Sequence, residues 1–178
     1  MVKASDGSRP VVIVTGAGTG LGCAYASHLA ALGWRVVVNN RVRNAPDGAP
    51  LPSPAEAVVA AILAAGGDAI AQHDDVCAEG AGQRMLDAAL GRWGRIDALV
   101  NNAGVAGKAA PLWEQDYADW TKCIRVNMDG VWNGCKAAVA AGAIVVAVPG
   151  GHSRRHDFTG ARFIAESLAD PRIYALLE

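Results

Sequence analysis

The sequence predicts an α/β protein with a doubly wound parallel sheet of about five strands, and two observations lead to this class. First, short runs such as Val11–Val14 are wholly apolar, as strands buried on both faces of a sheet are. Second, these runs alternate with helical patterns, which is typical of parallel strands joined by right-handed crossovers. Ligands of such sheets bind at the carboxyl ends of the strands.

Each element follows from its own pattern. Glycines at Gly33, Gly66 and Gly142 end three of the helices, and the Pro- and Gly-rich residues 41–54 form a surface loop. The longest helix is expected to bury one apolar face. The expected strands are 11–14, 34–39, 69–72, 96–100 and 143–148; the expected helices are 21–32, 55–65, 79–93 and 121–141, with short helices at 111–120, 161–168 and 172–177; the apolar face is Ile124, Met128, Val131, Cys135 and Val139.

Composition limits the function classes. A chain of 178 residues has the size of one domain, taken here as residues 1–178, and 16 basic against 17 acidic side chains favour neither nucleic acid nor an anionic membrane. No apolar stretch is long enough for a membrane helix, so a cytoplasmic protein is expected. The four cysteines lack metal or disulfide spacing. His152 and His156 have an i, i+4 spacing, but a solvated basic loop is the favoured interpretation and no metal is expected.

A glycine-rich loop follows the first strand. Its glycines are Gly16, Gly20 and Gly22, and with Thr19 and Leu21 they lead from the strand into a helix. Backbone N–H groups and the positive helix end then point at one place, which suits a pyrophosphate. The alternative is an ordinary glycine-rich turn.

Further short motifs follow the glycine loop along the chain: Asp75-Val76, Asn101-Asn102-Ala103-Gly104 and Val126-Asn127. Together with Thr15-Gly16, Gly20 and Gly22, these motifs resemble the short-chain dehydrogenase/reductase family, whose members are Rossmann-fold oxidoreductases that use NAD or NADP. The resemblance covers residues 10–148 and implies hydride transfer between a nicotinamide and an alcohol or carbonyl substrate. Residues 149–178 are an unmatched tail.

The resemblance implies roles for single residues. Asp75 would accept a hydrogen bond from the adenine amino group, or it is a helix cap. Asn127 would hold a water in a proton relay, or it is a satisfied structural amide. The implied cofactor-binding residues are Gly16, Thr19, Gly20, Leu21, Gly22, Asn40, Arg41, Asp75, Val76, Asn102, Ala103 and Gly104; Asn127 is the implied catalytic residue.

The choice of cofactor depends on the end of the second strand. NAD enzymes usually present an acid there, whereas Asn40 and Arg41 stand at this place. The sequence therefore favours NADP over NAD, with a solvent-facing Arg41 as the alternative.

The resemblance fails for the proton-transfer residues. The family uses a Tyr-x-x-x-Lys pair and a serine, but Tyr174 is followed four residues on by Glu178, and Val148-Pro149 stands at the serine's place. The family's C-terminal elements are not recognised either, so we expect the chain to be truncated or diverged after the fifth strand. An oxidoreductase and a catalytically inactive nucleotide-binding or scaffold protein remain as hypotheses. Apolar surface left uncovered by those elements predicts a homo-oligomer or poor stability.

Overall fold

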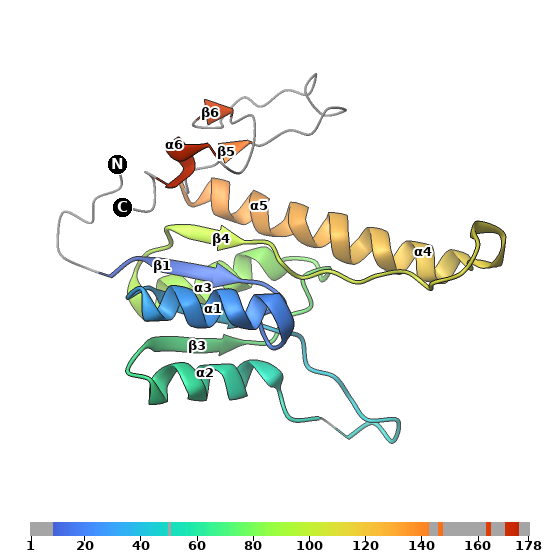
Figure 1. Cartoon of the computed structure of the whole chain (residues 1–178), viewed down its shortest axis with the longest axis horizontal. Coiled ribbons are helices and arrows are strands. Elements are labelled where there is room, and N and C mark those ends of the chain that lie inside the picture. The colour runs from blue at the N-terminus through green and yellow to red at the C-terminus, as the bar shows by residue number, and fades with distance from the viewer. Residues whose placement is uncertain (1–8, 50, 143–145, 148–162, 165–169, 175–178) are drawn as a thin grey trace.

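The computed structural model describes residues 9–49, 51–142, 146–147, 163–164 and 170–174. Four parallel strands form the main sheet in the order β3-β2-β1-β4. They are β1 (Val11–Val14), β2 (Arg35–Asn39), β3 (Asp68–Gln72) and β4 (Ala98–Val100). The chain therefore reverses direction across the sheet between β1 and β4 (Figure 1), and the predicted α/β class is confirmed.

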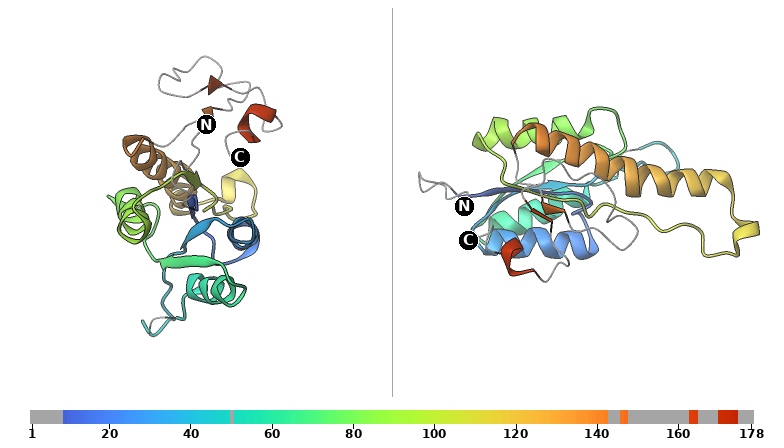
Figure 2. Two further views of the ribbon diagram at one scale, coloured as in Figure 1. Left: turned by 90° about the vertical axis from the view of Figure 1, so that its left-hand side faces the viewer. Right: turned by 90° about the horizontal axis from the view of Figure 1, so that it is seen from above.

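Alternate residues of the central strands pack against different helical layers. Val12 and Val36 belong to a core shared with α1 (Gly20–Ala31) and α2 (Pro54–Ala64). Ile13 and Val37 belong to a second core that includes Met85 of α3 (Ala81–Trp93). Figure 2 shows α1 and α2 on one face of the sheet, and α3 and α5 (Gly130–Ala140) on the other. Because both strand faces are buried, β1 and β2 need the continuous apolar runs seen in the sequence.

The glycine stops predicted from the sequence are confirmed. Gly33, Gly66 and Gly142 follow α1, α2 and α5 with φ values of 92°, 83° and 80°, a conformation that favours glycine. Helix α3 starts two residues later than the predicted residue 79, because Gly80 takes a φ of 72° immediately before it.

The long helix differs from its prediction in extent and in its buried face. It runs as α4 (Tyr117–Ile124), a π-helical segment η2 (Arg125–Asp129) and α5, preceded by the short 3₁₀ helix η1 (Leu112–Glu114). It begins before the predicted residue 121, because the Asp116 side chain caps it by accepting from Asp119 N at 2.8 Å. Figure 1 shows α4 extending beyond the sheet.

The predicted apolar face of this helix was wrong. Three of its members, Met128, Cys135 and Val139, are exposed, and the buried residues of α5 are Gly130, Gly134, Ala137 and Ala138. Small residues face inward because α5 packs closely. A Cβ on Gly134 would lie 2.7 Å from Asn101 Oδ1, and one on Gly82 of α3 would lie 2.1 Å from Asn133 O.

The last strands also correct the prediction. Val146–Ala147 form β5, but this strand pairs in parallel with β6 (Phe163–Ile164) in a separate two-stranded sheet and not with the main sheet. Residues 163–164 were expected in a helix. Parallel strands need a connection of a dozen or more residues, and β5 and β6 are far enough apart in the sequence for one. The helix α6 (Pro171–Tyr174) overlaps the short helix expected at 172–177.

Candidate functional site

A pocket of about 260 Å³ opens at the carboxyl end of the main sheet. The segments that follow all four strands line it, so residues far apart in the sequence meet at one place. This is the crevice that a doubly wound sheet forms where its strand order reverses. Its lining residues are Gly16, Thr19, Leu21, Gly22, Asn39, Asn40, Arg41, Arg43, Asp74, Asp75, Val76, Asn102, Ala103, Gly104, Val105 and Val126.

The glycine loop forms one wall of the pocket. Gly16 has a φ of 63°, and a Cβ there would lie 2.8 Å from the Cα of Ala103. A Cβ on Gly22 would lie 2.4 Å from Asn102 Nδ2 and 2.6 Å from Gly16 O. Gly20 is different, because it has a φ of 57° and open space around its Cβ position. Thus Gly16 and Gly22 allow a close approach of backbone segments, while Gly20 serves the turn.

The start of α1 leaves hydrogen-bond donors at this wall. Thr19 is the residue before the helix, and its side chain makes no capping hydrogen bond. The first N–H groups of a helix have no partner within the helix, and they carry its positive end. With Leu21 and Gly22 lining the pocket, this wall can bind an anionic group.

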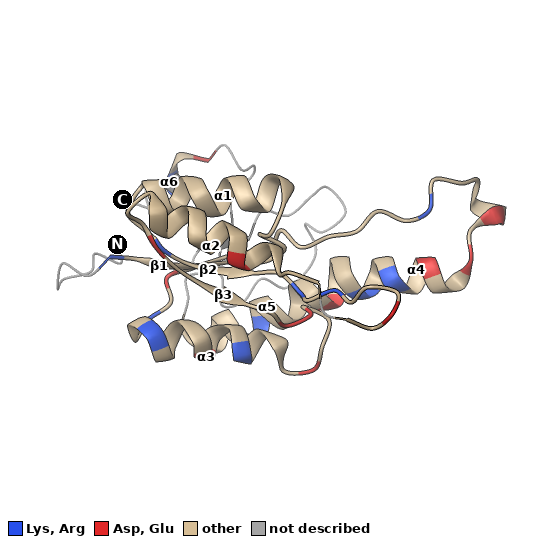
Figure 3. Cartoon of the chain, turned by 90° about the horizontal axis from the view of Figure 1, so that it is seen from below, with Lys and Arg blue, Asp and Glu red and all other residues tan. Residues whose placement is uncertain are grey.

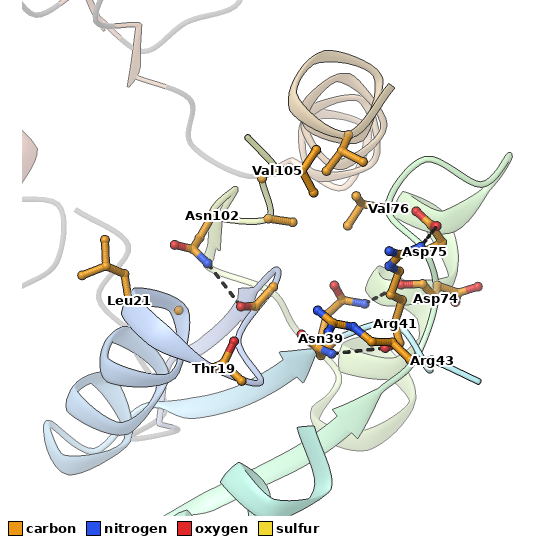
Figure 4. A pocket seen from close by; sticks show the side chains of 16 residues that line it. Thr19, Leu21, Asn39, Arg41, Arg43, Asp74, Asp75, Val76, Asn102 and Val105 are labelled. Atoms are coloured by element: carbon orange, nitrogen blue, oxygen red, sulfur yellow. Dashed lines mark hydrogen bonds and ion pairs between the residues drawn. The ribbon is translucent and has the colours of Figure 1, made fainter. Parts of the chain in front are cut away.

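Thr15 and Asn102 tie the glycine loop to the segment after β4. Thr15 is buried, and its Oγ1 accepts from Asn102 N and Ala103 N, each at 3.0 Å. In return, Asn102 Nδ2 donates to Thr15 O at 2.9 Å. The same amide also donates to Gly16 O at 3.4 Å (Figure 4). These bonds fix the two strand ends that flank the reversal of the sheet.

A polar network supports the opposite wall. Asn39, at the end of β2, is 1% exposed and donates from Nδ2 to Gln72 Oε1 at 2.6 Å and to Asp74 O at 3.0 Å. Gln72 Nε2 donates to Asp74 Oδ2, and Arg84 of α3 pairs with Asp74 Oδ1 at 2.7 Å. A buried amide needs such partners. The network therefore sets the spacing of the β2 and β3 ends.

Arg41 and Asp75 form an ion pair across this wall, with 3.5 Å between Arg41 Nη1 and Asp75 Oδ2. Partial burial alone would raise the pKa of Asp75. Hydrogen bonds from Cys77 and the positive charges of Arg41 and Arg125 outweigh that effect, so the pKa of Asp75 lies below its ordinary value. In turn, burial and the neighbouring Asp75 raise the pKa of the Cys77 thiol to about 11.

Asn127 lies in the π-helical segment and does not line the pocket. Its Oδ1 accepts from Val105 N and its Nδ2 donates to Val105 O, both at 2.9 Å. π-helical turns are rare and frequently mark functional positions. Here the amide holds the segment after β4, and its role in catalysis stays a prediction.

The structure brings most of the predicted site together. Eleven of the twelve predicted cofactor-binding residues line the pocket, and Gly20 does not, although it lies between Thr19 and Leu21, which do. Their binding roles stay predictions. Five lining residues were not among the predicted cofactor-binding residues; they are Asn39, Arg43, Asp74, Val105 and Val126. Val126 was recognised only as a motif residue beside Asn127, and Asn39 and Arg43 only as neighbours of Asn40 and Arg41.

The described residues hold neither a metal cluster nor a membrane-spanning helix. These residues contain no group of three or more potential ligands for a metal ion, and His152 and His156 lie outside them. None of the described helices is long and apolar enough to span a bilayer. Figure 3 shows basic and acidic residues interspersed along α4. All four cysteines are free thiols.

Comparison with known proteins gives one consistent result. A family model described as short chain dehydrogenase matches residues 10–148. A 3-oxoacyl-[acyl-carrier-protein] reductase from Synechocystis is 39% identical over 127 residues, which cover 71% of this chain and 48% of the relative. A 3beta-hydroxysteroid dehydrogenase 1 from Eggerthella lenta is 38% identical over 128 residues, covering 72% of this chain and 46% of the relative.

Two solved structures agree with the sequence matches. A short chain dehydrogenase from Mycobacterium avium superposes with a TM-score of 0.68 at 33% identity, covering 78% of this chain and 52% of that chain. A metagenomic short-chain oxidoreductase in complex with NADP gives a TM-score of 0.62 at 33% identity, covering 78% of this chain and 62% of that chain. This chain spans about half the length of the curated relatives named above.

Proposed function

Because the chain belongs to the short-chain dehydrogenase/reductase family, we propose that it binds a nicotinamide adenine dinucleotide and serves hydride transfer between an alcohol and a carbonyl compound. Residues 1–178 would act as a single nucleotide-binding domain. The four free thiols agree with a reducing compartment, and we place the function in the cytoplasm.

The observation that carries this proposal is the pocket at the carboxyl ends of β1 to β4. Its glycine wall has no room for a Cβ at Gly16 or Gly22 and presents the start of α1. A pyrophosphate fits this combination of close backbone and helix N-terminus. Asn102, Ala103 and Gly104 would line the path of the dinucleotide from the β4 side, while Asp75 and Val76 would border the adenine.

NADP is favoured over NAD by the charges after β2. Asn40, Arg41 and Arg43 line the pocket there, without the acid that would bond to a ribose 2′-hydroxyl and repel a 2′-phosphate. Arginine also suits a phosphate geometrically, because its guanidinium donates two parallel hydrogen bonds. The solved relative in complex with NADP supports the same choice.

A nicotinamide dinucleotide supplies the hydride acceptor or donor when bound. The chain's own part would be to bind and orient the dinucleotide, with Asn127 fixing the segment at Val105 beside it. A catalytically inactive nucleotide-binding or scaffold protein is the second candidate. The absence of a Tyr-x-x-x-Lys sequence from the 178 residues favours it.

The test has two stages. NADPH and NADH are titrated by fluorescence, and absorbance of the reduced cofactor is then followed with a panel of ketones. Gly91→Ala is the control, because its Cβ position on α3 is open. Loss of nucleotide binding in Gly22→Val, with binding kept in Gly91→Ala, would support a dinucleotide site at the glycine loop. Turnover of a ketone would favour the oxidoreductase. Nucleotide binding without turnover would favour the inactive candidate, and the absence of binding by the folded protein would refute both.

A further inference from the structure

Two carboxylates line the pocket, and they differ in their partners. Asp74 Oδ1 is engaged by Arg84, with a 2.8 Å bond from Nε and a 2.7 Å contact to Nη2, and Asp74 Oδ2 accepts from Gln72. Asp75 has no such partner from α3 within the described residues, and its Oδ2 faces Arg41 at 3.5 Å. Asp75 therefore supplies the negative charge that faces Arg41 after β2.

Asp75 is held in place, while Arg41 is not. Asp75 Oδ1 accepts from Cys77 N at 3.0 Å and its backbone carbonyl accepts from Ala78 N at 2.9 Å, so the carboxylate is fixed by its own turn. The side chains of Arg41 and Asp75 are 50% and 41% exposed, and ion pairs with this exposure contribute little. A stronger anion can therefore draw the guanidinium away from Asp75.

The candidate anion is the 2′-phosphate assigned above to the end of β2. Arg41 and Arg43 both line the pocket there, and the guanidinium of Arg43 has no ion pair with another described residue. The two arginines thus differ before a phosphate binds, because Arg41 is already paired with the Asp75 carboxylate and Arg43 is not. A phosphate that binds Arg41 must replace the Asp75 contact.

We propose that Asp75 sets how strongly the pocket prefers a 2′-phosphorylated adenine nucleotide, by competing with the phosphate for the guanidinium of Arg41. This inference rests on the proposed nucleotide-binding function. It gives Asp75 an effect on selectivity in addition to its predicted contact with adenine. The lowered pKa of Asp75 keeps the competitor charged at neutral pH.

Isothermal titration calorimetry with adenosine 2′,5′-bisphosphate and 5′-AMP tests this, because the two probes differ only in the 2′-phosphate. The ratio of their affinities cancels the loss of any adenine contact. In Asp75→Asn, which keeps an acceptor for Cys77 N, we expect the ratio to rise by about three- to fivefold, the range that an exposed ion pair can account for. Asp75→Ser is the second variant in case Asp75→Asn does not fold.

Arg41→Ala separates competition for the Arg41 guanidinium from direct repulsion between the Asp75 carboxylate and the 2′-phosphate. The ratio should fall in Arg41→Ala, and adding Asp75→Asn to that variant should raise it by much less than in the wild type. Asp74→Asn is the matched control, and it should shift the ratio less than Asp75→Asn because Asp74 pairs with Arg84.

The outcomes distinguish this inference from the function on which it rests. An unchanged or lower ratio in Asp75→Asn, or an equal rise in the presence of Arg41→Ala, overturns the competition while leaving nucleotide binding intact. A folded wild-type protein that binds neither probe nor NADPH overturns the proposed function and this inference with it.

Discussion

The side-chain amide of Asn127 forms a closed pair of hydrogen bonds with the backbone of Val105, accepting from its N–H and donating to its carbonyl at 2.9 Å each. The pair joins the π-helical segment between α4 and α5 to the segment after β4. Val105 lines the pocket and Asn127 does not. Asn127 thus reaches the site through the backbone that it holds.

Asn127→Ala should lower both stability and nucleotide affinity. Two hydrogen bonds are lost, and at a net contribution of about 0.5–1.5 kcal/mol each we expect the free energy of unfolding to fall by about 1–3 kcal/mol. Urea unfolding and NADPH titration measure the two effects. Gln83→Ala, which removes a surface bond to Asp87, should change stability by less than about 0.5 kcal/mol. Unchanged unfolding and affinity in Asn127→Ala would show that the pair is dispensable.

Thr15→Val should be more costly than Thr15→Ser. Valine keeps the shape of the side chain but leaves Asn102 N and Ala103 N without their acceptor in a part-buried place. We expect the free energy of unfolding to fall by about 2–6 kcal/mol, because two donors lose their acceptor, at about 1–3 kcal/mol for each donor left buried without a partner. Serine keeps the hydroxyl, so Thr15→Ser should retain most of the stability that Thr15→Val loses. Equal midpoints for the two variants in thermal or urea unfolding would argue against the role of the hydroxyl.

Substitution of alanine for Gly22 and for Gly91 should change the stability of the fold in opposite directions. Gly22→Ala places a Cβ 2.6 Å from Gly16 O, and overpacking of this kind costs about 1–3 kcal/mol. Gly91→Ala, in α3 with open space at the Cβ position, should stabilise the protein by about 0.5–1 kcal/mol through helix propensity. Urea unfolding of the two variants checks both predictions. A stabilised Gly22→Ala variant would refute the close approach of Gly22 to the backbone of Gly16.

Cys77 should react slowly with alkylating agents. A thiol with a pKa of about 11 is ionised to about one part in a thousand at pH 8, and only the thiolate reacts. Iodoacetamide labelling followed by peptide mass spectrometry should show labelling of Cys77 about 100-fold slower than in the urea-unfolded chain. The rate should keep rising toward pH 11, and Asp75→Asn should increase it at pH 8. A plateau of the rate below pH 9 would contradict the raised pKa.

The exposed face of the long helix predicts self-association. Tyr117, Trp120, Met128 and Trp132 are 81%, 55%, 60% and 61% exposed, and apolar patches of this kind mark interaction sites. Size-exclusion chromatography with light scattering should detect an oligomer, and Trp132→Glu should weaken it by about tenfold or more, as loss of a central aromatic contact does. Lys122→Ala is the control on the same helix. A wild-type protein that is monodisperse, monomeric and melts cooperatively would contradict the prediction.

The sequence was sufficient for the strands of the main sheet and for the helix stops. Val11–Val14 could be recognised because both faces of a central strand are buried, which leaves a continuous apolar run. Gly33, Gly66 and Gly142 could be recognised because a positive φ favours glycine. The buried face of α5 could not be predicted by hydrophobicity, since its packing requires small residues and leaves Cys135 and Val139 exposed.

By itself, the sequence determined the order in which the strands of the main sheet and their connecting helices follow one another, and the place of the glycine loop, because both depend on local backbone preference and burial. Only the tertiary structure decided which side chains meet. It pairs Arg41 with Asp75 and Asn127 with Val105, and it closes the Asn39, Gln72 and Asp74 network. Apart from the Gln72–Asp74 bond, these contacts join residues that are distant in the chain, and the distances between them are set by how the parallel strands line up at one edge of the sheet.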